Sequence, residues 1–165
     1  MENKIAEVSA LAVTEKEKLA SRLFRKGYNC AQAVFAAFAE EMGMDELEAV
    51  RLASAFGGGM GRMREVCGAM SAALLVLGKL DGYTDVVDHA VKKRYYARIQ
   101  ALMGRFRDEM GSYVCRELLG VKGAESPEPA IRDEAYYASR PCEKCCMAAA
   151  RLIEEEIINQ PRQNV

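Results

Sequence analysis

Six cysteines are the side chains of this 165-residue chain with the most distinctive chemistry. They are Cys30, Cys67, Cys115, Cys142, Cys145 and Cys146. A thiol can ligate a metal, exchange disulfides, or fill a helix interface as a small apolar group. The last three cysteines lie close together directly after Pro141, whereas the first three are widely separated. Their role therefore depends on whether the fold brings distant thiols together.

Four of the cysteines fall where the sequence predicts the opening turn of a helix. These four are Cys30, Cys67, Cys115 and Cys142. Asn29 is a predicted N-cap, and Pro141 favours the first helical position of the segment that follows it. Free backbone N–H groups and the positive end of the helix dipole can lower a thiol pKa from about 8.5 towards 3.5–7.5. The sequence thus predicts reactive thiolates, gathered in one electropositive pocket if these helix starts meet.

The C-terminal cysteines form a CxxC motif, Cys142 to Cys145, with Cys146 beside it. Positions three and four apart share one face of a helix, so either later thiol is placed to resolve a disulfide formed at Cys142. No βαβ pattern surrounds the motif, which argues against a thioredoxin fold.

The positions between the cysteines are helical in pattern nearly throughout, and no segment alternates for long enough to predict a strand. The capping signals and apolar periodicity predict helices from Thr14 to Gly27, Asn29 to Gly43, Asp45 to Phe56, Val66 to Leu80, Asp85 to Met110, Ser112 to Gly120, and from Pro141 onwards. We expect an all-α, single-domain bundle of about six to seven helices over residues 1–165, with a frayed tail at 160–165. The segment 66–80 is apolar most of the way round and rich in small residues, which predicts a central helix.

Two apolar patterns predict further burial. The third helix carries the apolar residues Leu47, Leu52 and Ala53, and the helix 85–110 buries a stripe that runs from Val87 to Phe106. The three glutamates at 154–156 are expected to form a solvated face.

Composition excludes several classes of protein. Lys and Arg number 23 against 24 Asp and Glu, a net charge of −1, so nucleic acid is not an expected partner despite the basic and aromatic stretch 92–100. The longest apolar run, at 69–77, is far shorter than the roughly 20 residues that span a bilayer, and the charged opening segment lacks the core of a secretory signal. We expect a cytoplasmic protein without membrane insertion, where thiols stay reduced and metal binding or reversible thiol chemistry is favoured over a stable disulfide framework.

The glycine-rich segment 57–61 lacks the spacing of a phosphate-binding loop. We expect it to shape the approach to Cys67, with the backbones of Gly58, Gly59, Gly61 and Gly68 admitting a cofactor closely. Arg62 and Arg64 would raise the local potential around Cys67. His89, the single histidine, is expected at the surface.

Four stretches resemble a known family. They are GYNCAQAVFAAF at 27–38, FGGGMGRMREVCGAM at 56–70, CRELLG at 115–120 and RPCEKCC at 140–146. They resemble the C_GCAxxG_C_C proteins, described as redox-active, over about residues 24–152. The resemblance implies a helical domain whose four defining cysteines are Cys30, Cys67, Cys115 and Cys142, with Cys145 and Cys146 as additions. It also implies an association with oxidoreductases and transporters, and a similar domain attached to an unusual cytochrome has been linked to an iron–sulfur cluster. Ala72 stands where the motif has its second glycine, which narrows any close approach there.

Three functions remain open at this point. The thiols exchange disulfides or transfer electrons with a redox partner protein; the four defining cysteines ligate zinc or an iron–sulfur cluster; or the cysteines are structural in a helical interaction module. The additional cysteines and Ala72 favour exchange, which would make the chain a thiol-dependent oxidoreductase. Whether it is an enzyme, whether it holds any cofactor and whether it forms a homo-oligomer are left undecided.

Overall fold

The computed structural model describes residues 12–159, so the predicted frayed tail at 160–165 and most of the charged opening segment lie outside it. The helices are α2 (Glu15–Lys26), α3 (Cys30–Ala37), α4 (Glu46–Ala53), η1 (Ser54–Phe56), α5 (Gly57–Met60), α6 (Gly68–Asp81), α7 (His89–Met110), α8 (Cys115–Leu119), α9 (Glu134–Ser139) and α10 (Cys142–Asn159). Within 12–159 the only β pairing is an isolated antiparallel bridge between Val66 and Val114. The all-α prediction is confirmed. No described helix is both long and apolar enough to cross a membrane.

Local capping fixes where the first helices begin. The Thr14 side chain accepts a hydrogen bond from the backbone N–H of Glu17, whose carboxylate accepts one from the Thr14 N–H. Asn29 and Gln32 form the same reciprocal box at the start of α3. Each box satisfies two backbone donors that a helix start otherwise leaves free. The first residue of α3 is therefore Cys30, as predicted.

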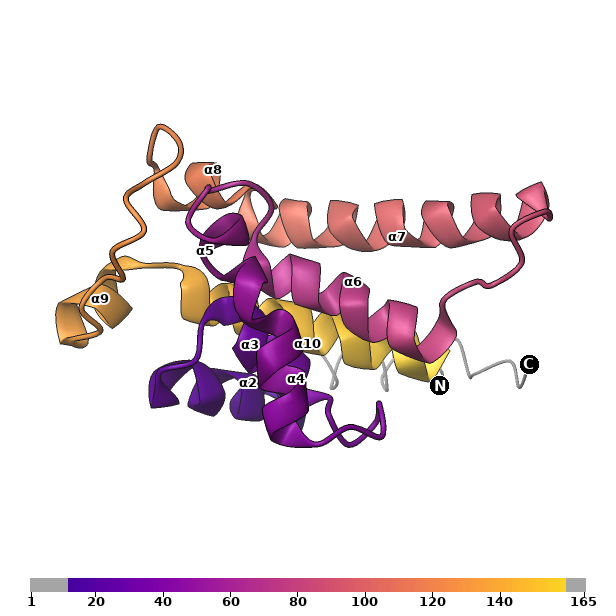
Figure 1. Cartoon of the computed structure of the whole chain (residues 1–165), viewed down its shortest axis with the longest axis horizontal. Helices are drawn as coiled ribbons and strands as arrows, with labels where there is room; N and C mark the ends of the chain where they lie inside the picture. Colours follow the sequence, from indigo (N-terminus) through magenta and orange to yellow (C-terminus); the bar gives the residue numbers. More distant parts are fainter. Residues whose placement is uncertain (1–11, 160–165) are drawn as a thin grey trace, which may run out of the picture.

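The core is built around α3, α6 and α10. The helix α10 packs on α2, α3 and α6, while α3 also packs on α2, α4 and α6 (Figure 1). Fully buried alanines such as Ala33, Ala73 and Ala149 lie on these three helices. Small side chains allow the helix axes to approach closely, which is why α6 takes the central place that its composition predicts.

The long helix α7 runs along the outside of α6 and α10 (Figure 1). Of its predicted apolar stripe only the C-terminal part is buried, at Leu102 and Phe106, and Val87 precedes the helix and is 78% exposed. Of the apolar residues predicted for α4, Ala53 is buried, whereas Leu47 and Leu52 are more than half exposed, because Ala49 and Ala53 form its inner side. Apolar periodicity identified these helices but not which side the neighbouring elements cover.

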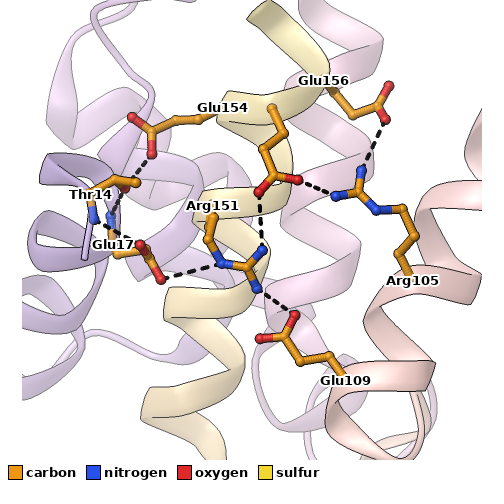
Figure 2. Close-up of polar contacts among 8 residues, drawn as sticks. Thr14, Glu17, Arg105, Glu109, Arg151, Glu154 and Glu156 are labelled. Carbon is orange, nitrogen blue, oxygen red and sulfur yellow. Dashed lines mark hydrogen bonds and ion pairs between the residues drawn. The ribbon is translucent and has the colours of Figure 1, made fainter. Parts of the chain in front are cut away.

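Ion pairs attach α7 to the rest of the bundle. Arg151 of α10 contacts Glu17, Glu109 and Glu155, and thereby joins α2, α7 and α10 (Figure 2). Arg105 of α7 pairs with Glu155 and Glu156. The glutamates at 154–156 are therefore not a solvated face as predicted, but the acidic side of a network between helices.

Other boundaries differ from prediction by a few residues. α3 ends at Ala37 and continues to Gly43 only as turns. α8 begins at Cys115 with Val114 as its N-cap, since the Ser112 hydroxyl accepts from the N–H of Val114 and closes a turn before the helix. The short helix α9 was not predicted.

Candidate functional site

The described fold brings five of the six cysteines to one cavity of about 50 Å³. The starts of α6, α8 and α10 lie at the same end of the bundle (Figure 1). The thiol-bearing residues that line the cavity are Cys30, Cys67, Cys115, Cys142 and Cys145. Cys30, Cys115 and Cys142 are the first residues of α3, α8 and α10, and Cys67 is the N-cap of α6. The predicted convergence of four helix starts is what the geometry shows.

The isolated bridge positions two of these thiols. The Cys67 N–H donates to the Tyr113 carbonyl at 2.8 Å, and the Cys115 N–H donates to the Glu65 carbonyl at 2.6 Å. Both cysteines are direct neighbours of the Val66–Val114 pair. Because side chains alternate across an extended segment, Cys67 and Cys115 project from the same face of the bridge, towards the cavity.

A left-handed turn precedes this bridge. Residues 58–62 all have positive φ between 58° and 68°, including the non-glycine residues Met60 and Arg62. Arg64 has a φ of 60° as well. A left-handed conformation costs a residue with a side chain roughly 1–2 kcal/mol. The turn is closed by bonds from the N–H of Arg64 to the Gly58 carbonyl and from the N–H of Glu65 to the Gly59 carbonyl. The result is that Arg64 is directed inwards and is only 2% exposed.

Two of the four glycines predicted to admit a cofactor, Gly59 and Gly68, pack closely against cysteines. A methyl group on Gly68 would lie 2.5 Å from the Cys30 Sγ, and one on Gly59 would lie 2.7 Å from the Cys115 Cβ. Gly58 and Gly68 also line the cavity, whereas a methyl group on Gly61 would have no described atom within 4 Å. Ala72 is fully buried and is not among the described residues that line the cavity.

The remaining contacts distinguish Cys145 from Cys146. Cys67 and Cys145 both line the cavity, and the interaction with Cys145, followed by burial, raises the pKa of Cys67 well above its usual value. Cys146 is fully buried and its thiol donates to the Cys30 carbonyl oxygen, with a sulfur–oxygen distance of 3.7 Å. Cys145 therefore belongs to the cavity, and Cys146 belongs to the interface between α10 and α3.

The thiol pKa values run opposite to the sequence prediction. Burial, followed by the repulsion of neighbouring thiolates, raises the pKa of Cys30 and of Cys142 to about 12. Burial likewise raises the pKa of Cys146 well above its usual value. The helix starts do act as expected: backbone N–H groups of Gly58 and Ala31 lower the pKa of Cys30. Their effect is smaller than the cost of removing a thiolate from water. At neutral pH these thiols hold their protons.

Cys115 has a cationic partner among the described residues. Arg64 donates through Nη1 to the Cys115 Sγ at 3.7 Å and through Nε to the carboxylate of Glu125. Burial still raises the pKa of Cys115, and Arg64 opposes that shift. Arg62, predicted to help as well, turns away to the Ser126 carbonyl and also pairs with Glu125.

The described residues do not form a set of metal ligands. Within residues 12–159 no three His, Cys, Asp or Glu side chains are grouped so that they could hold a metal ion. Five of the six cysteines line the cavity, and each of the six is a free thiol. In this arrangement the residues do not fit zinc or an iron–sulfur cluster, and we derive no step through either.

Sequence reasoning missed two arginines at the cavity, Arg132 and Arg140. Arg132 lies in the irregular segment between α8 and α9, where nothing in the local sequence pattern indicates burial. Arg140 carried a signal, since it directly precedes the Pro141 that begins the cysteine-bearing helix α10.

Comparison with known proteins agrees with this arrangement of cysteines. No curated protein and no solved structure matches the chain. A family model described as "Putative redox-active protein (C_GCAxxG_C_C)" matches residues 28–156, which include all six cysteines. The chain belongs to this C_GCAxxG_C_C family.

Proposed function

We propose that this protein is a thiol oxidoreductase that cycles between a dithiol and a disulfide, with Cys67 and Cys145 as the pair that is oxidised. The observation that carries the proposal is that these two buried cysteines line the same cavity, and their interaction, which raises the pKa of Cys67, supports the pairing. The family description as redox-active supports the general chemistry.

The reaction balances with a substrate disulfide as oxidant. The Cys145 sulfur attacks one sulfur of the substrate disulfide, and the first substrate thiol leaves with the proton. The Cys67 sulfur then attacks Cys145 in the mixed disulfide, and the second substrate thiol leaves with the second proton. Two electrons and two protons pass from the cysteine pair to the substrate. The opposite direction reduces the protein and oxidises a dithiol partner.

The roles of the other cavity thiols follow from their surroundings. Cys30 and Cys142 are partly exposed, so they lie nearer to solvent than Cys67 and Cys145. Cys115 accepts a hydrogen bond from Arg64, and this arginine opposes the rise in pKa that burial causes. We assign these three to guiding the substrate disulfide towards Cys145 rather than to the stored disulfide.

The test is to oxidise the reduced protein with glutathione disulfide and map the products. We expect the free thiol count to fall by two, a tryptic peptide joined through Cys67 and Cys145, and full recovery with dithiothreitol. Cys67→Ser and Cys145→Ser should each abolish the bond. Cys146→Ser is the matched control, because Cys146 is equally buried on the same helix but does not line the cavity.

Retention of all six thiols under oxidising buffer would remove the proposal and leave cysteines that serve packing alone. A bond that forms equally well in Cys145→Ser would show that a different pair is oxidised. Metal analysis of protein purified without oxygen tests the alternative that the cysteines are metal ligands. Stoichiometric iron or zinc would show that the site binds metal and would refute disulfide exchange as its function.

A further inference from the structure

The charge around the cavity is unbalanced. Arg64, Arg132 and Arg140 line it, and none of the described residues that line it is an aspartate or glutamate. The nearest compensating carboxylate, Glu125, is shared between Arg64 and Arg62 and is not in the lining. The wall is therefore rich in positive charge, and the described carboxylates compensate it only at Arg64, through Glu125.

Arg64 carries the most specific evidence. Its Nε is bonded to Glu125 and its Nη1 to Cys115, but its Nη2 is buried with no hydrogen-bond partner among the described residues. Leaving a buried donor unpaired is unfavourable, and such groups are rare in folded proteins. A guanidinium presents its donors in a fixed planar fork, which suits an oxyanion.

The other two arginines, unlike Arg64, have no ion pair with an acidic residue in the described chain. Arg132 lies over the rings of Phe24 and Tyr136, at 4.3 and 5.1 Å from their centroids, and Arg140 lies over Tyr136 at 4.7 Å. Stacking on aromatic faces orients both guanidiniums without neutralising their charge. Both arginines also act on the site, since Arg140 lowers the pKa of Cys115 and Cys142, and Arg132 that of Cys146.

Helix starts add to this field. The helices α3, α6 and α10, of 8, 14 and 18 residues, all begin at the cavity, so three positive dipole ends point to the same space. The volume of about 50 Å³ has room for roughly three to five water molecules, which is the size of a carboxylate, sulfonate or sulfate group.

We propose that the cysteine cavity binds a small oxyanionic group, with the free Nη2 of Arg64 as the central donor and Arg132 and Arg140 supplying charge. The anion is either free or the acidic headgroup of a sulfur compound that the thiols act on. The second assignment, a disulfide bearing a carboxylate or sulfonate near its sulfurs, rests on the thiol function proposed above; binding of the anion itself does not.

Binding is tested by calorimetric titration of sodium sulfate into the reduced full chain at constant ionic strength. We expect Arg64→Gln to weaken sulfate binding by at least about tenfold. Arg62→Gln is the matched control. Arg62 shares Glu125 and the left-handed backbone with Arg64 but does not line the cavity, so the affinity should stay within about twofold. Arg140→Gln should cost about threefold and serves if Arg64→Gln does not fold, as checked by circular dichroism.

The source of the anion is tested by comparing two disulfide substrates, dithiodiacetate and the uncharged bis(2-hydroxyethyl) disulfide. A headgroup site predicts that dithiodiacetate oxidises the protein faster, with the preference lost in Arg64→Gln and kept in Arg62→Gln. Sulfate binding without this preference would assign the site to a free oxyanion.

Absence of sulfate binding at millimolar concentration, or equal binding by Arg64→Gln and Arg62→Gln, would overturn the proposal. Measuring sulfate binding in the Cys67→Ser/Cys145→Ser variant separates the two proposals. That variant cannot form the assigned disulfide but keeps all three arginines, so loss of redox activity leaves the anion site testable.

Discussion

Gly68 allows a sharp test of how the site is packed, because it lies where α6 meets the thiols. A methyl group at this position would lie 2.5 Å from the Cys30 Sγ and 2.8 Å from the Phe56 carbonyl oxygen. Both distances are well inside van der Waals contact, and the second atom belongs to the backbone and cannot rotate away. Overpacking a buried site typically costs about 1–3 kcal/mol. The better helix propensity of alanine offsets roughly 0.5–1 kcal/mol of this.

We therefore expect Gly68→Ala to lower the free energy of unfolding by about 1–2 kcal/mol, measured by urea denaturation followed by far-ultraviolet circular dichroism. Gly78→Ala on the same helix is the control, since the closest atom to its added methyl would be the Tyr95 hydroxyl at 3.8 Å. With only the helix propensity acting, Gly78→Ala should stabilise the protein by about 0.5–1 kcal/mol.

The prediction is that Gly68→Ala lowers the free energy of unfolding, whereas Gly78→Ala raises it. If Gly68→Ala were as stable as the original protein, the Cys30 sulfur would not lie against α6 and the cavity would be wider than described. Mass-spectrometric measurement of Cys30 alkylation in the native state adds a second readout. Displacement of its sulfur by the new methyl group should change the alkylation rate in Gly68→Ala and not in Gly78→Ala.

Two further predictions concern charge. In the folded protein the pKa of Cys30 and of Cys142 is about 12, which exceeds the value near 8.5 for a thiol in the unfolded chain. The stability linked to their protonated state is therefore fully present below about pH 8.5 and is lost as the pH rises towards 12. Urea unfolding at about pH 7.5, 9 and 10.5 should show this fall, and a variant with alanine at both positions should show a smaller one. Arg151→Ala should lower stability by about 1 kcal/mol in dilute buffer and by less in roughly 1 M salt, because the side chain that joins three helices is only 27% exposed. Arg107→Ala, which removes only an exposed pair with the adjacent Asp108, should change stability by less than about 0.5 kcal/mol at either salt concentration.

The parts of the fold that the sequence predicts correctly are set by local interactions. The reciprocal boxes at Thr14 and Asn29 involve residues three apart, so their pattern is visible in the sequence and their geometry follows from it. The position of Cys30 as a first helical residue is a consequence of the second box. Pro141 fixes the start of α10 in the same local way, and with it the place of Cys142.

The sequence predicts burial only in part. The small residues of α6 indicate its central place, but Leu47 and Leu52 of α4 are more than half exposed because neighbouring elements cover the side that carries Ala49 and Ala53. The same lack of information explains the error in the thiol pKa values. A helix start is a local feature that favours a thiolate, whereas desolvation depends on how closely the surrounding helices pack.

Arg64 shows why the charge of the site was also hidden. Its neighbour Arg62 has the same sequence context, and only the tertiary contact with the segment around Cys115 separates the inward residue from the outward one. Arg132 reaches the cavity from beyond a long irregular segment, where no periodicity relates sequence position to orientation.

Protonated thiols and a cationic wall are two results of the same packing. Helix starts and arginines create a positive potential in the cavity, which thiolates would lower. Close packing removes water from the sulfurs and places them near one another, so that the first thiolate to form disfavours the next. The thiols consequently stay neutral while the positive field persists, with Arg64 Nη2 left without a described partner. A site arranged in this way is suited to an anion supplied from outside the chain, held beside sulfurs that keep their protons until a substrate disulfide is attacked.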